Sequence, residues 1–255
     1  MNKIHRLPPP DCLNDQISDS KQKKIEFYQD LWDKSGKIKS RWNSTCKEGG
    51  LVSKIRQTLL ELSNKTCVYC GVKIDNSSMD VDHYLPSSEF PYLAYCWDNL
   101  LPTCKKCNQN IKSNFCPQSL AGKKIVEPIL EEHFEQDLIY DKAHLLTSIA
   151  KDDRLIEPTY DNPKDHLEFN PEFYFYESKT KIGELTRVKF FKHKEVISEW
   201  EKLSQFIHAL VQKIQDKQVI LETLKLYIEL HGQEYVCLKF YEYWLKEQKD
   251  GRIDR

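Results

Sequence analysis

An α+β fold that is mostly helical is predicted by three features of the 255-residue sequence. Apolar residues recur every three or four positions before residue 66 and after residue 195, which is the period of an amphipathic helix. Between these segments, short β-branched and aromatic runs separated by turn residues indicate strands. Two pairs of cysteines frame this middle segment. We therefore expect a small core between N-terminal helices and a C-terminal helical bundle.

The N-terminal region, residues 1–66, is predicted to hold two helices. The first runs from Lys21 to about Gly36, and the second covers residues 51–62 and leads directly to Cys67. This region carries 13 Lys and Arg against 8 Asp and Glu. Such an excess permits a face that attracts phosphate groups, although a solvated helix surface is the simpler explanation.

The middle region is taken as residues 67–175 and the C-terminal region as residues 176–255. A helix is predicted near residues 130–148, and turn formers followed by aromatic residues indicate loops and a short strand over 154–178. After residue 195 the apolar spacing predicts a helical hairpin or small bundle. Its first helix carries an apolar seam, which packs within the chain or against a partner: Val196, Trp200, Leu203, Ile207, Leu210 and Ile214. A second apolar pattern follows at Ile220, Leu224 and Tyr227.

The composition is that of a soluble globular protein, with 40% hydrophobic and 30% charged residues and a net charge of −1. No apolar run approaches the roughly 20 residues that cross a bilayer. The sequence MNKIHRLPPPDCL at the start has no apolar core of a signal peptide. We expect a cytoplasmic protein that does not contact a membrane.

Nine cysteines are many for such a protein, and an odd number without a secretion signal argues against a disulfide framework. Four of them form two pairs, CVYC at Cys67 and Cys70 and CKKC at Cys104 and Cys107. The other five are expected to be ordinary small buried residues: Cys12, Cys46, Cys96, Cys116 and Cys237.

The two pairs predict a structural zinc site. Two residues between cysteines allow both thiolates of a tight turn to reach one metal at about 2.3 Å, and two such turns complete a tetrahedral four-sulfur site. The 33 residues between Cys70 and Cys104 are more than a compact zinc ribbon needs. The zinc would therefore clamp the base of a larger unit, and four thiolates leave no open position for chemistry.

Four polar residues lie inside this frame or directly after it: Asp82, His83, Asn99 and Asn108. Hydrolysis of a phosphodiester needs an activated water, a Lewis acid at the phosphate and stabilisation of the leaving oxygen. A histidine suits the first task, and a hard divalent cation held by carboxylate and amide oxygens suits the other two. An isolated Asp–His pair is better explained as a capped turn. Its place between the cysteine pairs is what favours a catalytic site.

The stretches CVYCG, DVDHYLP, WDNLL and CKKCNQNIK resemble the HNH endonuclease motif in its zinc-knuckle form, the ββα-metal fold. The resemblance implies that His83 is the general base and Asp82 a ligand of the catalytic metal. It also implies that Asn99 orients the loop that presents the histidine, and that Asn108 is the second metal ligand. With an amide in place of an imidazole, the expected ion is Mg²⁺ or Mn²⁺.

One position departs from the family pattern, which often has a lysine three residues after the last ligand. Ile111 stands there, and Lys112 is one residue further. On an α-helix one residue turns the side chain by about 100°, so we do not expect Lys112 to reach a phosphate. Lys105 and Lys106 are alternatives, although both are expected to be solvated.

Further stretches resemble one HNH subfamily: MNKIHRLPPP, LVSKIRQTLLEL, SSEFPYLAYCWDNLL and LIEPTYDNPKDHLEF. It comprises the nucleases of Septu-type bacterial anti-phage systems and of some retron systems, encoded beside an ABC/SMC-like ATPase. This likeness covers the first 170 residues. It implies a toxic effector nuclease that is held in a complex with its ATPase. His166, in the last stretch, is expected to tie down the acidic loop.

Two classes of function remain open at this point. The first is a metal-dependent HNH endonuclease that hydrolyses nucleic acid, with DNA favoured as the substrate. The second is a zinc-stabilised nucleic-acid-binding or structural subunit without cleavage activity, which needs the cysteines but not His83. The combined set of Asp82, His83, Asn99 and Asn108 favours the nuclease.

Overall fold

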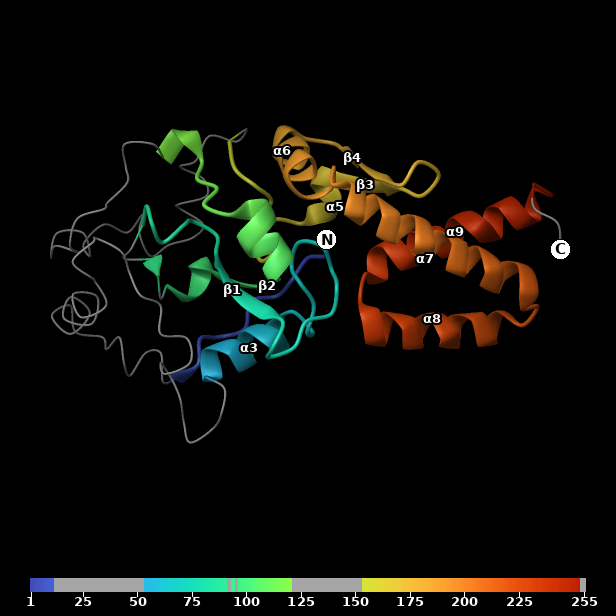
Figure 1. Cartoon of the computed structure of the whole chain (residues 1–255), viewed down its shortest axis with the longest axis horizontal. Helices are drawn as coiled ribbons and strands as arrows, with labels where there is room; N and C mark the ends of the chain where they lie inside the picture. The colour runs from blue at the N-terminus through green and yellow to red at the C-terminus, as the bar shows by residue number, and fades with distance from the viewer. Residues whose placement is uncertain (12–52, 91–92, 95, 121–152, 253–255) are drawn as a thin grey trace, which may run out of the picture.

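The structure is a computed structural model that describes residues 1–11, 53–90, 93–94, 96–120 and 153–252. The helices predicted at 21–36 and 130–148 lie outside these residues. Within the described ranges, no helix combines the length and the apolar character needed to span a bilayer. Figure 1 shows two neighbouring parts, a small mixed core and a set of helices toward the C-terminus.

The core contains the predicted ββα unit. This unit consists of β1 (Met79–His83), β2 (Leu100–Cys104) and η3 (Lys106–Lys112), and α3 (Lys54–Leu62) precedes it in the core. Helix α3 begins at Ser53, whose hydroxyl accepts a hydrogen bond from the Arg56 backbone N–H, and it buries its apolar face. Strands β1 and β2 pair antiparallel, with Asp82 opposite Leu101 and His83 opposite Leu100. Helix η3 follows β2 almost directly and packs against the hairpin.

Helix η3 is a π-helix, which the sequence did not predict. Its end is marked by a hydrogen bond across five residues, from the Ser113 backbone N–H to the Asn108 carbonyl at 2.8 Å. A π-helix turns through a smaller angle per residue than an α-helix, and such turns often occur at functional sites. Residue 112 therefore points close to the direction that residue 111 would have in an α-helix.

The C-terminal part begins with a one-turn helix and a hairpin: α5 (Pro163–His166), β3 (Leu167–Asn170) and β4 (Phe175–Ser178). Four helices follow: α6 (Lys181–Phe190), α7 (Lys194–Lys213), α8 (Lys217–His231) and α9 (Glu234–Lys249). The predicted bundle is confirmed as α7 to α9, whereas α6 was not expected as a separate helix. The β3–β4 hairpin spans the predicted boundary between residues 175 and 176, and the division into three regions stays a prediction.

Most of the apolar seam of α7 is buried within this chain. Val196, Trp200, Leu203 and Ile207 are buried, mainly because α9 packs along α7, and Leu210 and Ile214 are half-buried. The Trp200 ring lies 5.1 Å from the Phe169 ring of β3, centroid to centroid. Helix α8 differs, because only Ile220 and Leu224 are buried on it. Its exposed apolar side chains are Val219, Leu226 and Leu230.

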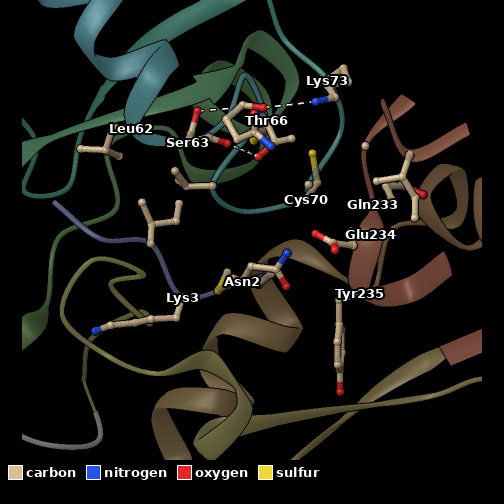
Figure 2. A pocket seen from close by; sticks show the side chains of 18 of the residues that line it. Asn2, Lys3, Leu62, Ser63, Thr66, Cys70, Lys73, Gln233, Glu234 and Tyr235 are labelled. Carbon is tan, nitrogen blue, oxygen red and sulfur yellow. Dashed lines mark hydrogen bonds between the residues drawn. The ribbon is translucent and has the colours of Figure 1, made fainter. Parts of the chain in front are cut away.

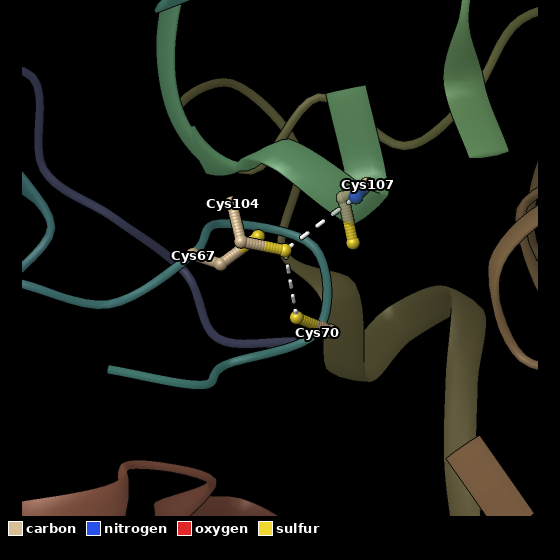
Figure 3. A group of neighbouring side chains, drawn as sticks. All are labelled: Cys67, Cys70, Cys104 and Cys107. Atoms are coloured by element: carbon tan, nitrogen blue, oxygen red, sulfur yellow. Dashed lines mark hydrogen bonds between the residues drawn. The ribbon is translucent and has the colours of Figure 1, made fainter. Parts of the chain in front are cut away.

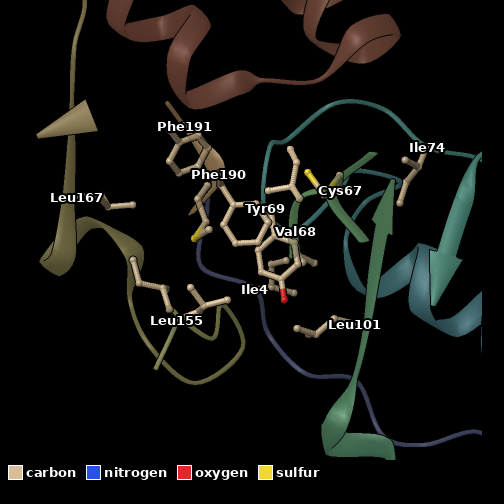
Figure 4. Close-up of a cluster of buried hydrophobic side chains, with 14 of the residues drawn as sticks. Ile4, Cys67, Val68, Tyr69, Ile74, Leu101, Leu155, Leu167, Phe190 and Phe191 are labelled. Carbon is tan, nitrogen blue, oxygen red and sulfur yellow. The ribbon is translucent and has the colours of Figure 1, made fainter. Parts of the chain in front are cut away.

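The two parts of the molecule meet at the first cysteine pair. The ring of Tyr69, between Cys67 and Cys70, stacks on Phe190 at the end of α6, with centroids 4.3 Å apart (Figure 4). Two residues after Cys70, Val72 forms a β-bridge with Gly232 in the turn between α8 and α9. The chain around the first cysteine pair is thus a contact surface for both α6 and the α8–α9 turn.

Backbone hydrogen bonds fix the contact between the α8–α9 turn and the chain after Cys70. The Gln233 N–H donates to the Gly71 carbonyl at 2.7 Å, and the Lys73 N–H donates to the His231 carbonyl at 3.0 Å. A cavity of about 390 Å³ lies beside these bonds. Figure 2 shows Cys70 and Lys73 among its lining residues, together with Gln233 and Glu234 at the start of α9.

Replacing Gly232 with alanine is expected to destabilise the fold by about 2 kcal/mol or more, because strained backbone conformations of this kind cost about 1–3 kcal/mol. Its φ is +80°, and a Cβ there would lie 2.2 Å from the Gly71 carbonyl oxygen. Urea unfolding measures the loss. Gly251→Ala is the matched control, since Gly251 also has a positive φ of +68° but nothing lies within 4 Å of its Cβ position. Equal losses for the two variants would show that the contact with Gly71 contributes nothing.

Candidate metal centre and active site

The four paired cysteines come together as predicted. The Sγ atoms of Cys67, Cys70, Cys104 and Cys107 all lie within 4.8 Å of one another (Figure 3). Cys67 and Cys70 come from the turn after α3, whereas Cys104 ends β2 and Cys107 lies in the first turn of η3. It is the only such cluster of metal-ligating side chains in the part of the chain that the structure describes.

The spacing of the sulfurs fits one tetrahedral metal ion. For metal–sulfur bonds of about 2.3 Å, the edge of a sulfur tetrahedron is about 3.8 Å, and Cys70 Sγ lies 3.8 Å from Cys104 Sγ. Hydrogen bonds from the three neighbouring thiols lower the pKa of Cys104, so a thiolate, the form that binds metal, is favoured there. Of the other described cysteines, Cys237 is buried as expected, while Cys96 and Cys116 are half-buried.

His83 is the last residue of β1 and its side chain is half-buried. Its Nε2 lies 2.9 Å from the Ala94 carbonyl oxygen. A carbonyl oxygen can only accept a hydrogen bond, so Nε2 carries a proton and Nδ1 is the basic nitrogen of the neutral ring. Burial lowers the pKa of His83 below its usual value. The hydrogen bond to Ala94 acts in the opposite direction, but burial outweighs it, so the neutral imidazole that accepts a proton is favoured.

Asp82 is buried, and only 2% of its surface is exposed. The Tyr69 hydroxyl donates to its Oδ2 at 2.8 Å, and the Lys112 ammonium donates to its Oδ1 at 3.0 Å. Burial and the neighbouring carboxylate raise the pKa of Tyr69 well above its usual value, so the hydroxyl stays protonated as a donor. Removing one partner of a buried ion pair of this kind costs about 3–5 kcal/mol.

Lys112 packs against β1, a contact that was not expected, while the expectation that it does not reach a phosphate stays a prediction. Only 1% of its surface is exposed, and its ammonium also donates to the His83 carbonyl oxygen at 2.7 Å. The expectation assumed the 100° step of an α-helix, whereas η3 is a π-helix and returns residue 112 to the side that faces β1. Lys105 is exposed, as expected, and Lys106 is half-exposed.

Asn99 is buried and links the two ends of the loop between β1 and β2. Its Oδ1 accepts from the Leu85 N–H at 2.8 Å, and its Nδ2 donates to the carbonyls of Leu85 and Leu93 at 3.0 and 3.2 Å. Leu93 precedes Ala94, the residue that holds the His83 ring. These contacts are what the predicted orienting role requires. The effect of Asn99 on catalysis stays a prediction.

Asn108 lies on η3, one π-turn before Lys112. Its Nδ2 is 3.3 Å from Oδ2 of Asp80, which also accepts from Gln109 Nε2 at 2.7 Å. The structure therefore brings Asn108 to the β1 hairpin, although its side chain contacts Asp80 and not Asp82. With an amide oxygen on Asn108 and a carboxylate on Asp82, the donor chemistry fits a hard divalent cation. Asp82 Oδ1 already holds a cation, the Lys112 ammonium.

A buried loop that the sequence did not connect with the site supports the residue after His83. The Tyr84 hydroxyl donates to the Leu155 carbonyl at 2.7 Å. Arg154 and Asp161 form a two-pronged ion pair at 2.6 and 2.8 Å, and Asp161 also accepts from the Glu157 N–H. This network gives the stretch LIEPTYD a structural role. Only the density of charged and turn-forming residues in that stretch hinted at it.

His166 follows this loop, and its Nδ1 lies 2.9 Å from the Thr180 hydroxyl at the start of α6. The expected structural role thus takes a different form, since the ring binds the residue that caps α6 and not the acidic loop.

Comparison with known proteins agrees with this geometry. The family model of the HNH endonucleases matches residues 67–114, a range that begins at the first cysteine and includes every predicted site residue. The chain carries an HNH domain. Within that HNH domain, the two strands and η3 are the ββα unit, and the four cysteines close its base.

Two relatives extend the similarity beyond the HNH domain. Septu protein PtuB of Bacillus thuringiensis is 34% identical over 115 residues, which are 44% of this chain and 32% of that protein. Septu protein PtuB of Bacillus mycoides (strain KBAB4) is 25% identical over 191 residues, 69% of this chain and 59% of that protein. The chain thus spans between about a third and three fifths of the length of these relatives. No solved structure is significantly similar to it.

The four-sulfur centre should hold about one metal ion per chain, and zinc is the expected element. Cys104→Ser should lose this ion and give unfolded or insoluble protein, because domains of this kind depend on metal binding for much of their folding free energy. Elemental analysis and solubility measure both effects. Cys237→Ser is the control, since Cys237 is buried but lies outside the cluster. A soluble, cooperatively folded Cys104→Ser protein without metal would contradict the structural role.

Proposed function

We propose that this chain is a metal-dependent HNH endonuclease that hydrolyses phosphodiester bonds of nucleic acid, with DNA as the favoured substrate. It acts as the effector nuclease of a bacterial anti-phage defence complex in the cytoplasm, of the Septu type or of the related retron type. The proposal is supported chiefly by the neutral, oriented imidazole of His83 inside the matched HNH domain. The similarity to two Septu proteins supports the role in defence.

In the proposed reaction, Nδ1 of His83 takes a proton from a water molecule that attacks the phosphorus atom. The hydrogen bond from Nε2–H to the Ala94 carbonyl keeps the ring in the required orientation and tautomer. Asn99 fixes the loop that carries this carbonyl. The Tyr69–Asp82 contact and the Lys112 ammonium hold the end of β1 from the other side.

A divalent ion, Mg²⁺ or Mn²⁺, would be held by Asp82 and Asn108 and would supply a Lewis acid at the phosphate and at the leaving oxygen. The four-cysteine centre has no part in this chemistry. We propose zinc there, because four thiolates are typical of a structural zinc site and leave no position for water or substrate.

Replacing His83 with alanine should lower cleavage by at least about 100-fold, because a positioned general base contributes about 10²–10⁴-fold. Stability should fall by only about 1 kcal/mol, the net contribution of one hydrogen bond. The measurement is cleavage of plasmid DNA and of total RNA with Mn²⁺, Mg²⁺ or EDTA. Metal content and thermal unfolding are recorded in parallel.

His193→Ala is a matched control for that variant. The His193 ring makes the same kind of contact, from Nε2 to the Lys189 carbonyl at 3.0 Å, but it lies at the start of α7, outside the HNH domain. It should lose similar stability and keep its activity. Nucleic-acid binding without cleavage by the native protein would instead support the alternative, a binding or structural subunit. Cleavage of RNA alone would overturn the preference for DNA.

The partner that we propose is an ABC/SMC-like ATPase, and the contact surface is the exposed face of α8. The seam of α7 is not available for a partner, because it packs against α9 and the β3–β4 hairpin. Helix α8 leaves Leu226 and Leu230 with 56% and 61% of their surface exposed. An exposed apolar face of this kind often marks a protein–protein contact.

The double variant Leu226→Ser, Leu230→Ser should lose co-purification with the ATPase encoded beside this chain, while its fold is unchanged. A deletion of residues 196–255 is a poorer test, since it removes α9 and the contacts of Gln233 with Gly71. The control is Val188→Ser, Leu238→Ser, which truncates two exposed apolar residues on α6 and α9. Full retention of the ATPase by the α8 variant would place the contact elsewhere, with the basic N-terminal region as the next candidate.

A further inference from the structure

The most unusual feature of the HNH domain is a lysine ammonium at the place where a cation is expected. Lys112 Nζ is held by Asp82 Oδ1 at 3.0 Å and by the His83 carbonyl oxygen at 2.7 Å. Lys112 and Asp82 have only 1% and 2% of their surfaces exposed. Oxygen atoms of a carboxylate and a carbonyl are the ligands that a hard divalent cation prefers. The chain thus places its own positive charge on such a pair of oxygens.

The local backbone is specialised for this contact. Helix η3 is π-helical along its length, so that Lys112 reaches β1 from the same helix that carries Asn108. The other carboxylate oxygen of Asp82 accepts from the neutral Tyr69 hydroxyl. Without the ammonium, Asp82 would keep one hydrogen bond and would carry an uncompensated negative charge in a buried position. An unpaired buried charge is costly, and a bound cation would offset that cost.

A purely structural ion pair is the simpler explanation of this contact, and it makes a different prediction. If Lys112 only stabilises the fold, its removal weakens the protein and leaves metal binding unchanged. If the ammonium occupies part of a cation site, its positive charge lowers the affinity of Asp82 for a divalent ion, because neighbouring like charges repel strongly in a buried site. The two explanations are therefore separable by measuring metal affinity.

We infer that Lys112 and the divalent ion compete for Asp82, so that Lys112 sets the metal affinity of the HNH site. This inference rests on the proposed function for the identity of the Asp82 site. In the metal-free protein the ammonium neutralises Asp82 and fixes the end of β1 beside His83. The divalent ion must displace the ammonium from the Asp82 carboxylate, which lowers its affinity. The site is therefore filled only at a high concentration of the ion.

The test is binding of Mn²⁺ to the full-length, zinc-loaded protein in the absence of nucleic acid, measured by isothermal titration calorimetry. Lys112→Met and Lys112→Gln remove the charge, and Lys112→Arg retains it. We expect Mn²⁺ to bind the Met and Gln variants at least about tenfold more tightly than the native protein, while the Arg variant binds no more tightly. Lys105→Met, an exposed position at the start of the same helix, is the control and should be unchanged.

Thermal unfolding gives a second measurement. The neutral variants should be less stable than the native protein in EDTA and should gain more stability when Mn²⁺ is added, since a ligand that binds only the folded state stabilises it. Adding Asp82→Asn to Lys112→Gln should abolish the tight Mn²⁺ binding. The Gln side chain can still donate to Asp82, so this variant keeps the test valid if Lys112→Met does not fold.

Unchanged Mn²⁺ affinity in both neutral variants would overturn the inference and leave a structural ion pair. Tight binding that persists in the Asp82→Asn background would also overturn it, because the ion would then lie elsewhere. Neither result depends on cleavage. A protein that binds Mn²⁺ as expected but cuts no nucleic acid would contradict the proposed function alone.

Discussion

The structure depends on one constraint, the convergence of four thiolates from two distant parts of the chain. Their sulfur atoms, which are placed to hold one metal ion, bring the turn of Cys67 and Cys70 to the start of η3 at Cys104 and Cys107. The two donors that reach Asp82 come from these same two places, since Tyr69 lies inside the first pair and Lys112 at the end of the helix after the second. The metal centre therefore positions both hydrogen-bond donors of a buried carboxylate next to the proposed general base, although it lies outside the reaction itself.

The C-terminal helices are built on the same turn. Phe190 of α6 stacks on Tyr69, and the α8–α9 turn binds the backbone of Gly71. Figure 1 shows these helices next to the HNH core. A partner bound to the exposed face of α8 would therefore act on a segment that is only a few residues from the metal centre. The α8–α9 turn contacts the chain beside the four cysteines through one pair of backbone hydrogen bonds, whereas α6 contacts it through the stacked rings of Phe190 and Tyr69.

Much of the site followed from spacing in the sequence, because its signals are local. Cysteine pairs with two intervening residues, an Asp–His pair at a strand end and an asparagine after the second pair are each readable without a structure. The contact of Lys112 with Asp82 was not expected, because the direction of a side chain depends on the helix type, and a π-helix is not visible in apolar periodicity. The loop that supports Tyr84 was not connected with the site, since the two segments are about 70 residues apart and meet only in the folded chain.

The sequence by itself determined the cysteine frame, the ββα order and the helical C-terminus, because each depends on residue types at short, regular intervals. Only the tertiary structure decided what Asp82 contacts, whether the α7 seam is covered by this chain, and which face of the bundle remains exposed. Burial and charge pairing depend on which surfaces meet, and short-range patterns do not carry that information. The same reason explains why Asp82, expected as an open metal ligand, lies in the folded protein between a tyrosine hydroxyl and a lysine ammonium.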